Sequence, residues 1–218
     1  MHFEILVEDV SGKVALEHLL PNVLNGRATF SIHPYKGIGH IPKGLKTTLD
    51  ASTRVLLNQL PRLLAGYGRA FSKYPADYKA AVIVVCDLDS RDLGGFLGEL
   101  QAVLDSCNPK PEGLFCIAIE EGESWLLGHK EAVLTAYPAS NKTLLEAYQY
   151  DSICGTWEVL ADIVYPGGSA ALQSKGKQEV GRVKSIWANE IAPLIDVSEN
   201  LSPSFCHFVK SIRSRIGA

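Results

Sequence analysis

Runs of consecutive apolar residues that end in acidic residues are the clearest hydrophobic pattern in this chain. The longest run, residues 80–86, is rich in β-branched types, and Asp87 and Asp89 follow it. An unbroken apolar run of this length is typical of a strand that is buried on both faces. It therefore predicts a strand in the middle of a parallel sheet, with the two aspartates at its carboxyl end.

Two further apolar runs end in the same way. Residues 3–7 predict a short strand, and residues 114–119 predict a second fully buried one. The acidic residues that follow these two runs are Glu8, Glu120, Glu121 and Glu123. Residues 27–32 alternate weakly and end at His33-Pro34, a pattern that indicates an edge strand.

Helical periodicity appears between the predicted strands. The apolar spacing predicts helices over about residues 11–24, 49–71 and 96–104, and another that starts at residue 124. Ser11 is the expected cap of the first helix, and Pro21 is expected to kink or shorten it. Strands that alternate with helices predict an α/β fold, a Rossmann-like core with a mostly parallel sheet flanked by helices.

The pattern changes after residue 138. No further apolar run predicts a strand, and helical spacing recurs over residues 180–191 and from Ser202-Pro203 onward. We therefore expect residues 1–138 to form the α/β core and residues 139–218 to form a helical extension that packs on it as one structural unit. A local basic cluster, usually a solvent-exposed face, consists of Lys175, Lys177, Arg182 and Lys184.

The composition is that of an ordinary soluble globular protein. The chain has 218 residues, of which 46% are hydrophobic and 21% charged, with a formal net charge of −3. Proteins that bind nucleic acid tightly on their own are commonly basic, so this balance argues against that class. It does not exclude an enzyme that meets nucleic acid transiently or with the help of a partner.

The cysteine spacing and the lengths of the apolar segments disfavour disulfide-bonded, zinc-binding and membrane-spanning proteins. The five cysteines are scattered without a C-x-x-C spacing, which argues against a disulfide framework and against a zinc site. No segment has the roughly 18 consecutive apolar residues of a membrane span, and the first residues lack a basic region before an apolar one. We therefore expect a cytoplasmic protein.

The acidic residues at the three strand ends are the main candidate functional residues. Carboxyl ends of parallel strands form the ligand crevice of open α/β sheets, so these carboxylates are expected on one rim. Like charges repel unless a cation lies between them, and hard divalent cations prefer carboxylate oxygens. In the simpler alternative, Asp89 or Ser90 caps the next helix and Asp87 is solvated. At least one of the three glutamates is expected only to complement a helix dipole.

A basic, glycine-rich loop is predicted over residues 35–44. It has neither a Walker spacing nor a dinucleotide fingerprint, so it gives no support for ATP or NAD binding. Lys36 and Lys43 are candidate phosphate contacts, and His40 is a candidate phosphate contact or proton shuttle. A solvated loop without function explains the same residues equally well.

Three stretches of the chain read ILVExxS at residues 5–11, DLD at 87–89 and AxxExExWLL at 118–127, and a weaker fourth reads SPSFxxF at 202–208. Together they resemble the TOPRIM metal site, which also occurs in the OLD-type nucleases, and more narrowly the TOPRIM-like, RloB-type family of bacterial proteins. The chain departs from the family pattern at Asp9, where glycine is usual, at Gly12, and at Gly128-His129, where an acid is common.

The resemblance implies a Mg²⁺- or Mn²⁺-dependent reaction at a phosphodiester bond, which would make the protein a nuclease. Asp87, Asp89 and Glu123 would hold one or two metals that activate water and stabilise the leaving oxygen. Glu8 would be a further metal ligand or the general base. Glu121 could replace Glu123 as a ligand.

The resemblance also implies transient contact with nucleic acid, an ABC-type or AAA ATPase as partner, and a role in anti-phage defence. Self-association through the helical extension is left open. One alternative is a catalytically degenerate module that docks on the ATPase or senses for it. Another is nucleotidyl transfer or phosphatase chemistry on the same acids, and the fold alone does not choose among these. Metal binding distinguishes the nuclease from the docking module.

Overall fold

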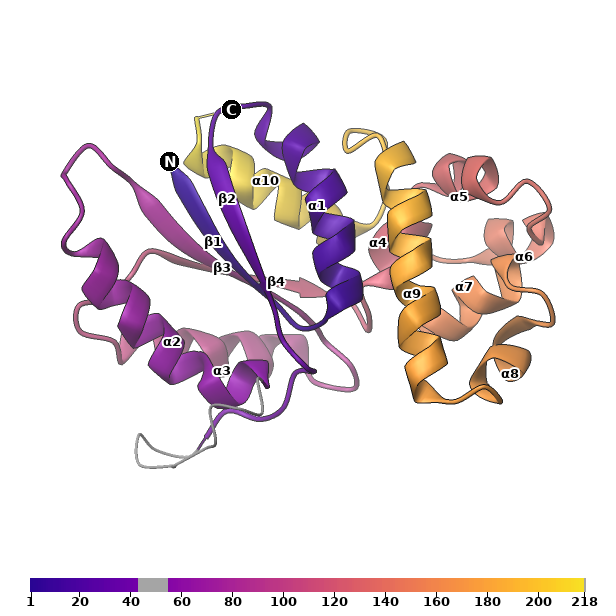
Figure 1. Ribbon diagram of the computed structural model, residues 1–218, viewed down its shortest axis with the longest axis horizontal. Helices are drawn as coiled ribbons and strands as arrows, with labels where there is room; N and C mark the ends of the chain where they lie inside the picture. Colours follow the sequence, from indigo (N-terminus) through magenta and orange to yellow (C-terminus); the bar gives the residue numbers. More distant parts are fainter. Residues whose placement is uncertain (43–54, 218) are drawn as a thin grey trace.

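A computed structural model describes residues 1–42 and 55–217 and confirms the predicted α/β class. Within these residues the chain forms a parallel sheet in the order β2-β1-β3-β4, flanked by helices (Figure 1). The strands are β1 (His2–Val7), β2 (Thr29–Pro34), β3 (Ala80–Asp87) and β4 (Gly113–Ala118). The longest apolar run is therefore an interior strand and β2 an edge strand, as predicted. Because the strands are parallel, their carboxyl ends share one edge.

Helices cover both faces of this sheet (Figure 1). The helices next to the sheet are α1 (Val10–Leu24), α2 (Leu56–Phe71), α3 (Leu93–Asp105) and α10 (Pro203–Arg215). Alternate residues of each strand point to opposite faces, so β1 contributes Leu6 to the core beneath α2 and α3. It contributes Phe3 and Ile5 to the core on the other face, which also contains Phe208 of α10.

The remaining helices form a lobe beyond one side of the sheet (Figure 1). They are α4 (Glu123–Leu127), α5 (Lys130–Ala136), α6 (Lys142–Ala147), α7 (Thr156–Val164), α8 (Gly168–Gln173) and α9 (Lys177–Ile191), followed by a short 3₁₀ turn at Ala192–Leu194. Helix α9 packs along α1, and α10 packs against β4. One hydrophobic core thus joins the lobe and the sheet, with Trp187 of α9 buried in it.

The cap of α1 differs from the prediction. Asp9, not Ser11, is the N-cap: its Oδ1 accepts from the Gly12 N–H at 2.7 Å, and its Oδ2 accepts from the Ser11 hydroxyl at 2.6 Å. A carboxylate at this position satisfies a free backbone donor and complements the helix dipole. The helix also continues through Pro21 to Leu24 instead of ending at the proline.

The cap of α3 decides between two interpretations of the residues after β3. Asp92 is the N-cap, and its side chain accepts from the Gly95 N–H at 2.7 Å. The alternative that Asp89 or Ser90 caps this helix is therefore wrong.

Helix α10 begins with Ser202 as its cap and proline in its first turn, as predicted. The predicted helix over residues 49–71 is described only from Leu56 onward.

No helix in the described part of the chain is both long enough and apolar enough to cross a lipid bilayer.

Candidate functional site

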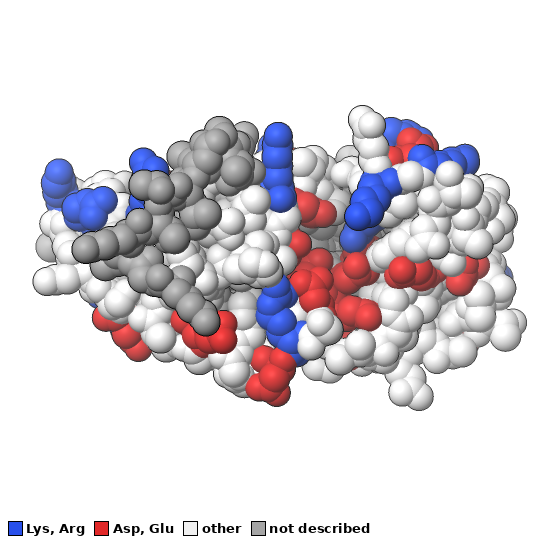
Figure 2. Space-filling model, turned by 90° about the horizontal axis from the view of Figure 1, so that it is seen from below, with Lys and Arg blue, Asp and Glu red and all other residues white. Residues whose placement is uncertain are grey.

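Acidic side chains gather in a hollow where the carboxyl ends of the strands meet the helical lobe. Figure 2 shows Asp and Glu side chains at the centre of this face, with basic side chains on both sides. Glu8, Asp87, Glu123 and Lys184 line a small pocket of about 40 Å³ here. A buried water needs roughly 10–15 Å³, so the pocket has room for a few waters or for an ion with part of its hydration shell.

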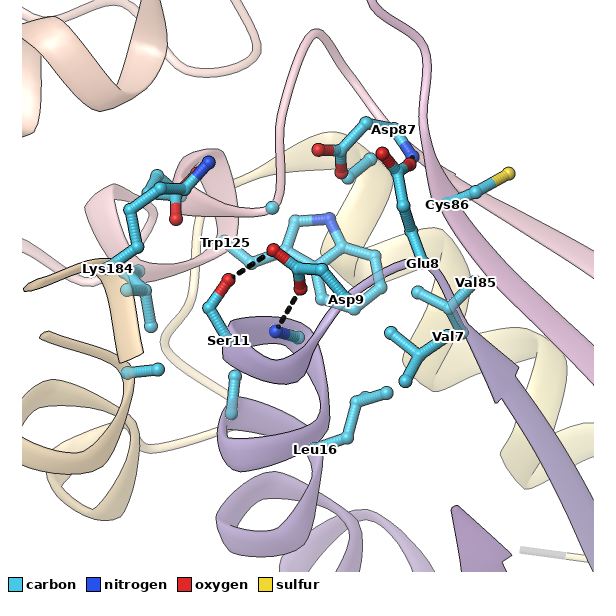
Figure 3. Close-up of a pocket in the computed structure, with 17 residues that line it drawn as sticks. Val7, Glu8, Asp9, Ser11, Leu16, Val85, Cys86, Asp87, Trp125 and Lys184 are labelled. Atoms are coloured by element: carbon cyan, nitrogen blue, oxygen red, sulfur yellow. Dashed lines mark hydrogen bonds and ion pairs between the residues drawn. The ribbon is translucent and has the colours of Figure 1, made fainter. Parts of the chain in front are cut away.

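Strand pairing places Glu8 and Asp87 next to each other. Strands β1 and β3 pair in register with Val7 opposite Val85, and the Asp87 N–H donates to Glu8 Oε2 at 3.2 Å. Figure 3 shows the two side chains together at one side of the pocket. The adjacent positions follow directly from two acids at the ends of neighbouring parallel strands.

Burial and neighbouring charges raise the pKa of both carboxyl groups. Burial raises the pKa of Glu8 to about 7, the Asp87 N–H opposes that rise, and the charges of Asp89 and Asp9 add to it. Burial, followed by the charge of Glu8, raises the pKa of Asp87 well above its usual range. Burial is thus the main reason that both carboxyl groups resist ionisation, and neighbouring acidic side chains add to its effect.

Glu123 and Lys184 form an ion pair on the other side of the pocket. Glu123 is in the first turn of α4 and is only 4% exposed. The Lys184 Nζ reaches it from α9 and lies 2.9 Å from Oε2, with the lysine side chain 14% exposed. Figure 3 shows Lys184 opposite Glu8 and Asp87. Burial alone would lower the pKa of Lys184, but Glu123, Glu121 and Asp87 together raise it, so the lysine stays charged.

Glu120 has a structural role. Its carboxylate accepts from the backbone N–H groups of Cys154, Gly155 and Thr156 at 2.9–3.0 Å and from the Thr156 hydroxyl. Burial acts to raise the pKa of Glu120, but these hydrogen bonds outweigh it and lower the pKa. Glu120 thus binds the N-terminus of α7, and not that of α4, the helix that follows it in the chain.

Glu121 lies between the helix N-terminus and the pocket. One oxygen accepts from the Trp157 N–H at 2.9 Å, and the other is 3.9 Å from Lys184 Nζ. Burial raises the pKa of Glu121 to about 7; Lys184 opposes this rise and Glu123 adds to it. Glu121 and Glu123 were predicted as alternative metal ligands. Of these two, Glu123 is the more buried and the closer to Lys184.

Asp89 lies on the exposed rim of the hollow. Its backbone adopts a left-handed conformation (φ 49°), its N–H donates to the Glu120 carbonyl at 3.0 Å, and its carboxylate pairs with Arg91 at 2.6 Å. The side chain is 47% exposed. Together with Glu121 and Trp157 it lines a second, open hollow of about 300 Å³.

The predicted phosphate contacts fall in different places. The loop after β2 is attached to the site, because the Gly37 N–H donates to the Glu8 carbonyl at 3.0 Å, and Lys36 next to it is exposed. His40 lies instead in a neighbouring groove that Arg91 also lines, and its N–H donates to Asn58. Lys43 lies outside the described residues.

Lys184 is the site residue that the sequence pattern did not identify. The basic cluster was interpreted as a solvent-exposed face, and for Lys184 this is wrong, because the residue is largely buried among the acids. A signal was present: Lys184 falls between Val183 and Trp187, which are buried, so it lies close to the apolar side of α9. A lysine there needs an acidic partner in the core.

The donor chemistry of this site suits a hard divalent cation, although its present arrangement is not a ligand cluster. Within residues 1–42 and 55–217, no three His, Cys, Asp or Glu side chains are grouped so as to hold a metal. Glu123 Oε2 is nevertheless buried without a hydrogen bond in proper geometry from any described group. Carboxylate oxygens are the ligands that hard divalent cations such as Mg²⁺ prefer, so the side chains of this pocket fit such a cation by their chemistry.

Comparison with known proteins found no match for this chain among family models, curated proteins or solved structures.

Proposed function

We propose that this protein hydrolyses phosphodiester bonds with the help of Mg²⁺ or Mn²⁺. The observation that carries the proposal is the excess of carboxylates in the pocket. Glu8, Asp87 and Glu123 line it, Glu121 adjoins it, and Lys184 is the one basic side chain among its described lining residues. Such an imbalance is costly without a bound cation, and a divalent metal would relieve it.

Glu8, Asp87 and Glu123 are the residues that would hold the metal, with Asp89 and Glu121 as further ligands at the rim. When bound, the metal supplies an acidified water and stabilises negative charge on the leaving oxygen. Glu8 would act either as such a ligand or, without binding the metal directly, as the general base that takes the proton from the attacking water.

Basic groups next to the pocket suit an anionic substrate. Lys36 follows β2 beside the Glu8 backbone, and Arg91 lines the groove that also contains His40. We assign them to the phosphates on either side of the cleaved bond. The ATPase partner and the role in anti-phage defence follow only from the family resemblance, and copurification of an ATPase from the native source would support them.

The test is nicking of supercoiled plasmid, and cleavage of an RNA oligonucleotide, by the purified protein with Mg²⁺ or Mn²⁺. We expect cleavage by the wild type and a loss of at least about 100-fold in Asp87→Asn, because that substitution removes a ligand charge at the centre of the site. Asp77→Asn, at an exposed loop position, is the matched control and should cleave like the wild type. Equal cleavage by Asp87→Asn would contradict the proposal.

The second candidate function is a non-catalytic module that docks on an ATPase. The Lys184–Glu123 pair favours it, because an internal cation balances one carboxylate without any metal. Thermal unfolding separates the two functions. A metal enzyme gains stability from Mn²⁺ through Asp87, whereas a docking module melts at the same temperature with Mn²⁺ and with EDTA.

A further inference from the structure

Lys184 is held in place by the packing of α9. Val183 and Trp187, on either side of it, are buried at 4% and 2% exposure, so the helix cannot turn to expose the lysine without opening the core. Its amino group is 2.9 Å from Glu123 and 3.9 Å from Glu121, and it faces Glu8 and Asp87 across the pocket (Figure 3). The lysine thus brings a fixed positive charge from the C-terminal lobe to the strand-end acids.

The contact between Lys184 and Glu123 balances charge without forming a directed hydrogen bond. Glu123 Oε2 has no hydrogen-bond partner in proper geometry among the described groups, although the ammonium is close to it. An ion pair this deeply buried loses much of its hydration, so it is a weak source of stability by itself. Without the lysine, however, Glu123 would be a buried carboxylate among other carboxylates.

We propose that Lys184 is a positioning residue that takes the place of metal charge when no metal is bound, and that a divalent cation must displace its ammonium group from Glu123 in order to bind. The inference rests on the proposed function, because it concerns the same metal. A cation of charge +2 and an ammonium repel strongly when they share one carboxylate in a poorly hydrated pocket. Lys184 therefore stabilises the metal-free protein and weakens its affinity for metal.

Arg91 offers a comparison within the same protein. It pairs with Asp89 at 2.6 Å, but the two side chains are 28% and 47% exposed, and the guanidinium also lies 5.0 Å from the centre of the Phe96 ring. Water screens an exposed pair, and Arg91 can move away into solvent. Removal of its charge should therefore change metal affinity much less than removal of the Lys184 charge.

The test measures Mn²⁺ binding by isothermal titration calorimetry on the metal-free full chain, without nucleic acid. Lys184→Met keeps the aliphatic stem and removes the charge, and we expect at least about fivefold tighter Mn²⁺ binding, in the usual range for coupled sites. The melting temperature in EDTA should fall, and its rise on adding Mn²⁺ should exceed that of the wild type. Lys184→Arg should bind Mn²⁺ like the wild type.

Two controls make the result specific. Lys177→Met is the same substitution at an exposed position of the same helix and should leave both readouts unchanged. Lys184→Gln is a second neutral variant whose amide can donate to Glu123. It should also bind Mn²⁺ more tightly, and it replaces the methionine variant if that one fails to fold.

The outcomes separate this inference from the proposed function. If the wild type binds Mn²⁺ clearly and both neutral variants bind it equally well or more weakly, the proposed role of Lys184 is contradicted. The proposed metal site is not contradicted by that result. Absence of Mn²⁺ binding in the wild type and in the neutral variants overturns the metal site, and the inference with it. A purely structural role for Lys184 would lower the melting temperature without tightening metal binding, and so also contradicts the inference.

Discussion

Three glutamates close together in the chain show that surroundings, not residue type, set the role of each carboxylate. Glu120 accepts four hydrogen bonds at the start of a helix and has a lowered pKa. Glu121 accepts a hydrogen bond from the Trp157 N–H and lies beside the pocket, and burial raises its pKa to about 7. Glu123 is buried against Lys184. Of the three, Glu123 is the one that lines the same small pocket as Glu8 and Asp87.

We expect the titration of Glu8 to make the stability of the protein depend on pH. Its pKa rises from an ordinary value of 4.5 to about 7 in the folded protein, mainly by burial, with Asp89 and Asp9 adding to the rise and Lys184 opposing it. Between these two values the folded state holds a proton that the unfolded chain has lost. Stability in EDTA therefore falls as the pH rises through this range, by up to roughly 3 kcal/mol from Glu8.

Urea unfolding of Glu8→Gln across this pH range checks the expectation. The fall in unfolding free energy should be clearly smaller than in the wild type, and the variant should be the more stable protein at about pH 8, because it has no buried charge at this position. Glu17→Gln, at an exposed position of α1, should follow the wild-type profile. A Glu8→Gln profile parallel to that of the wild type would show that Glu8 ionises normally.

At the scale of elements, the connection between β4 and α7 joins the sheet to the helical lobe. Helix α7 begins after Gly155, which has a left-handed backbone (φ 75°) and no capping side chain of its own. Glu120, just beyond the end of β4, supplies the acceptor that the helix N-terminus lacks. The same contact orients the chain segment on which Glu121 and Glu123 lie.

We expect Glu120→Ala to lower the free energy of unfolding by about 2 kcal/mol, because it leaves the first N–H groups of α7 without their carboxylate. Thermal or urea unfolding in EDTA measures this loss. Glu199→Ala, an exposed glutamate in a turn, should change stability by no more than about 0.5 kcal/mol. A Glu120→Ala variant as stable as the wild type would mean that solvent replaces the cap at no cost.

On the scale of the whole molecule, the C-terminal region completes the core of the sheet. Phe205 and Phe208 of α10 are fully buried and pack around Trp125, and Trp187 of α9 lies in the same core as Phe3 of β1. The division after residue 138 therefore separates two segments that share one hydrophobic core. Lys184 also connects the two segments, because it lies on α9 of the C-terminal segment and forms an ion pair with Glu123 in the pocket.

This packing predicts that residues 1–138 alone do not fold cooperatively, since one face of the sheet would lose the side chains that cover it. Circular dichroism during heating measures this directly, with the full chain as reference. In the full chain, Phe208→Ala should cost about 3–5 kcal/mol of unfolding free energy by opening a cavity. A sharp, cooperative melt of the isolated segment would contradict the expectation.

The positions of the strands and of most helices could be predicted from the sequence, because they depend on local periodicity and on caps such as Ser202. The strand-end acids could also be placed on one rim, since parallel strands align their carboxyl ends. The N-caps of α1 and α3 were missed, because Asp9 and Asp92 compete with nearby residues that could bond the same N–H groups.

By itself, the sequence determined the α/β class and the set of carboxylates, both of which follow from patterns within short stretches. Only the tertiary structure decided that Lys184 lies among these carboxylates, that Glu120 serves α7, and that Asp89 pairs with Arg91 on the rim. The reason is physical: burial, charge and hydrogen bonding act through distances in space, and for Lys184 and Glu120 these distances join distant parts of the chain.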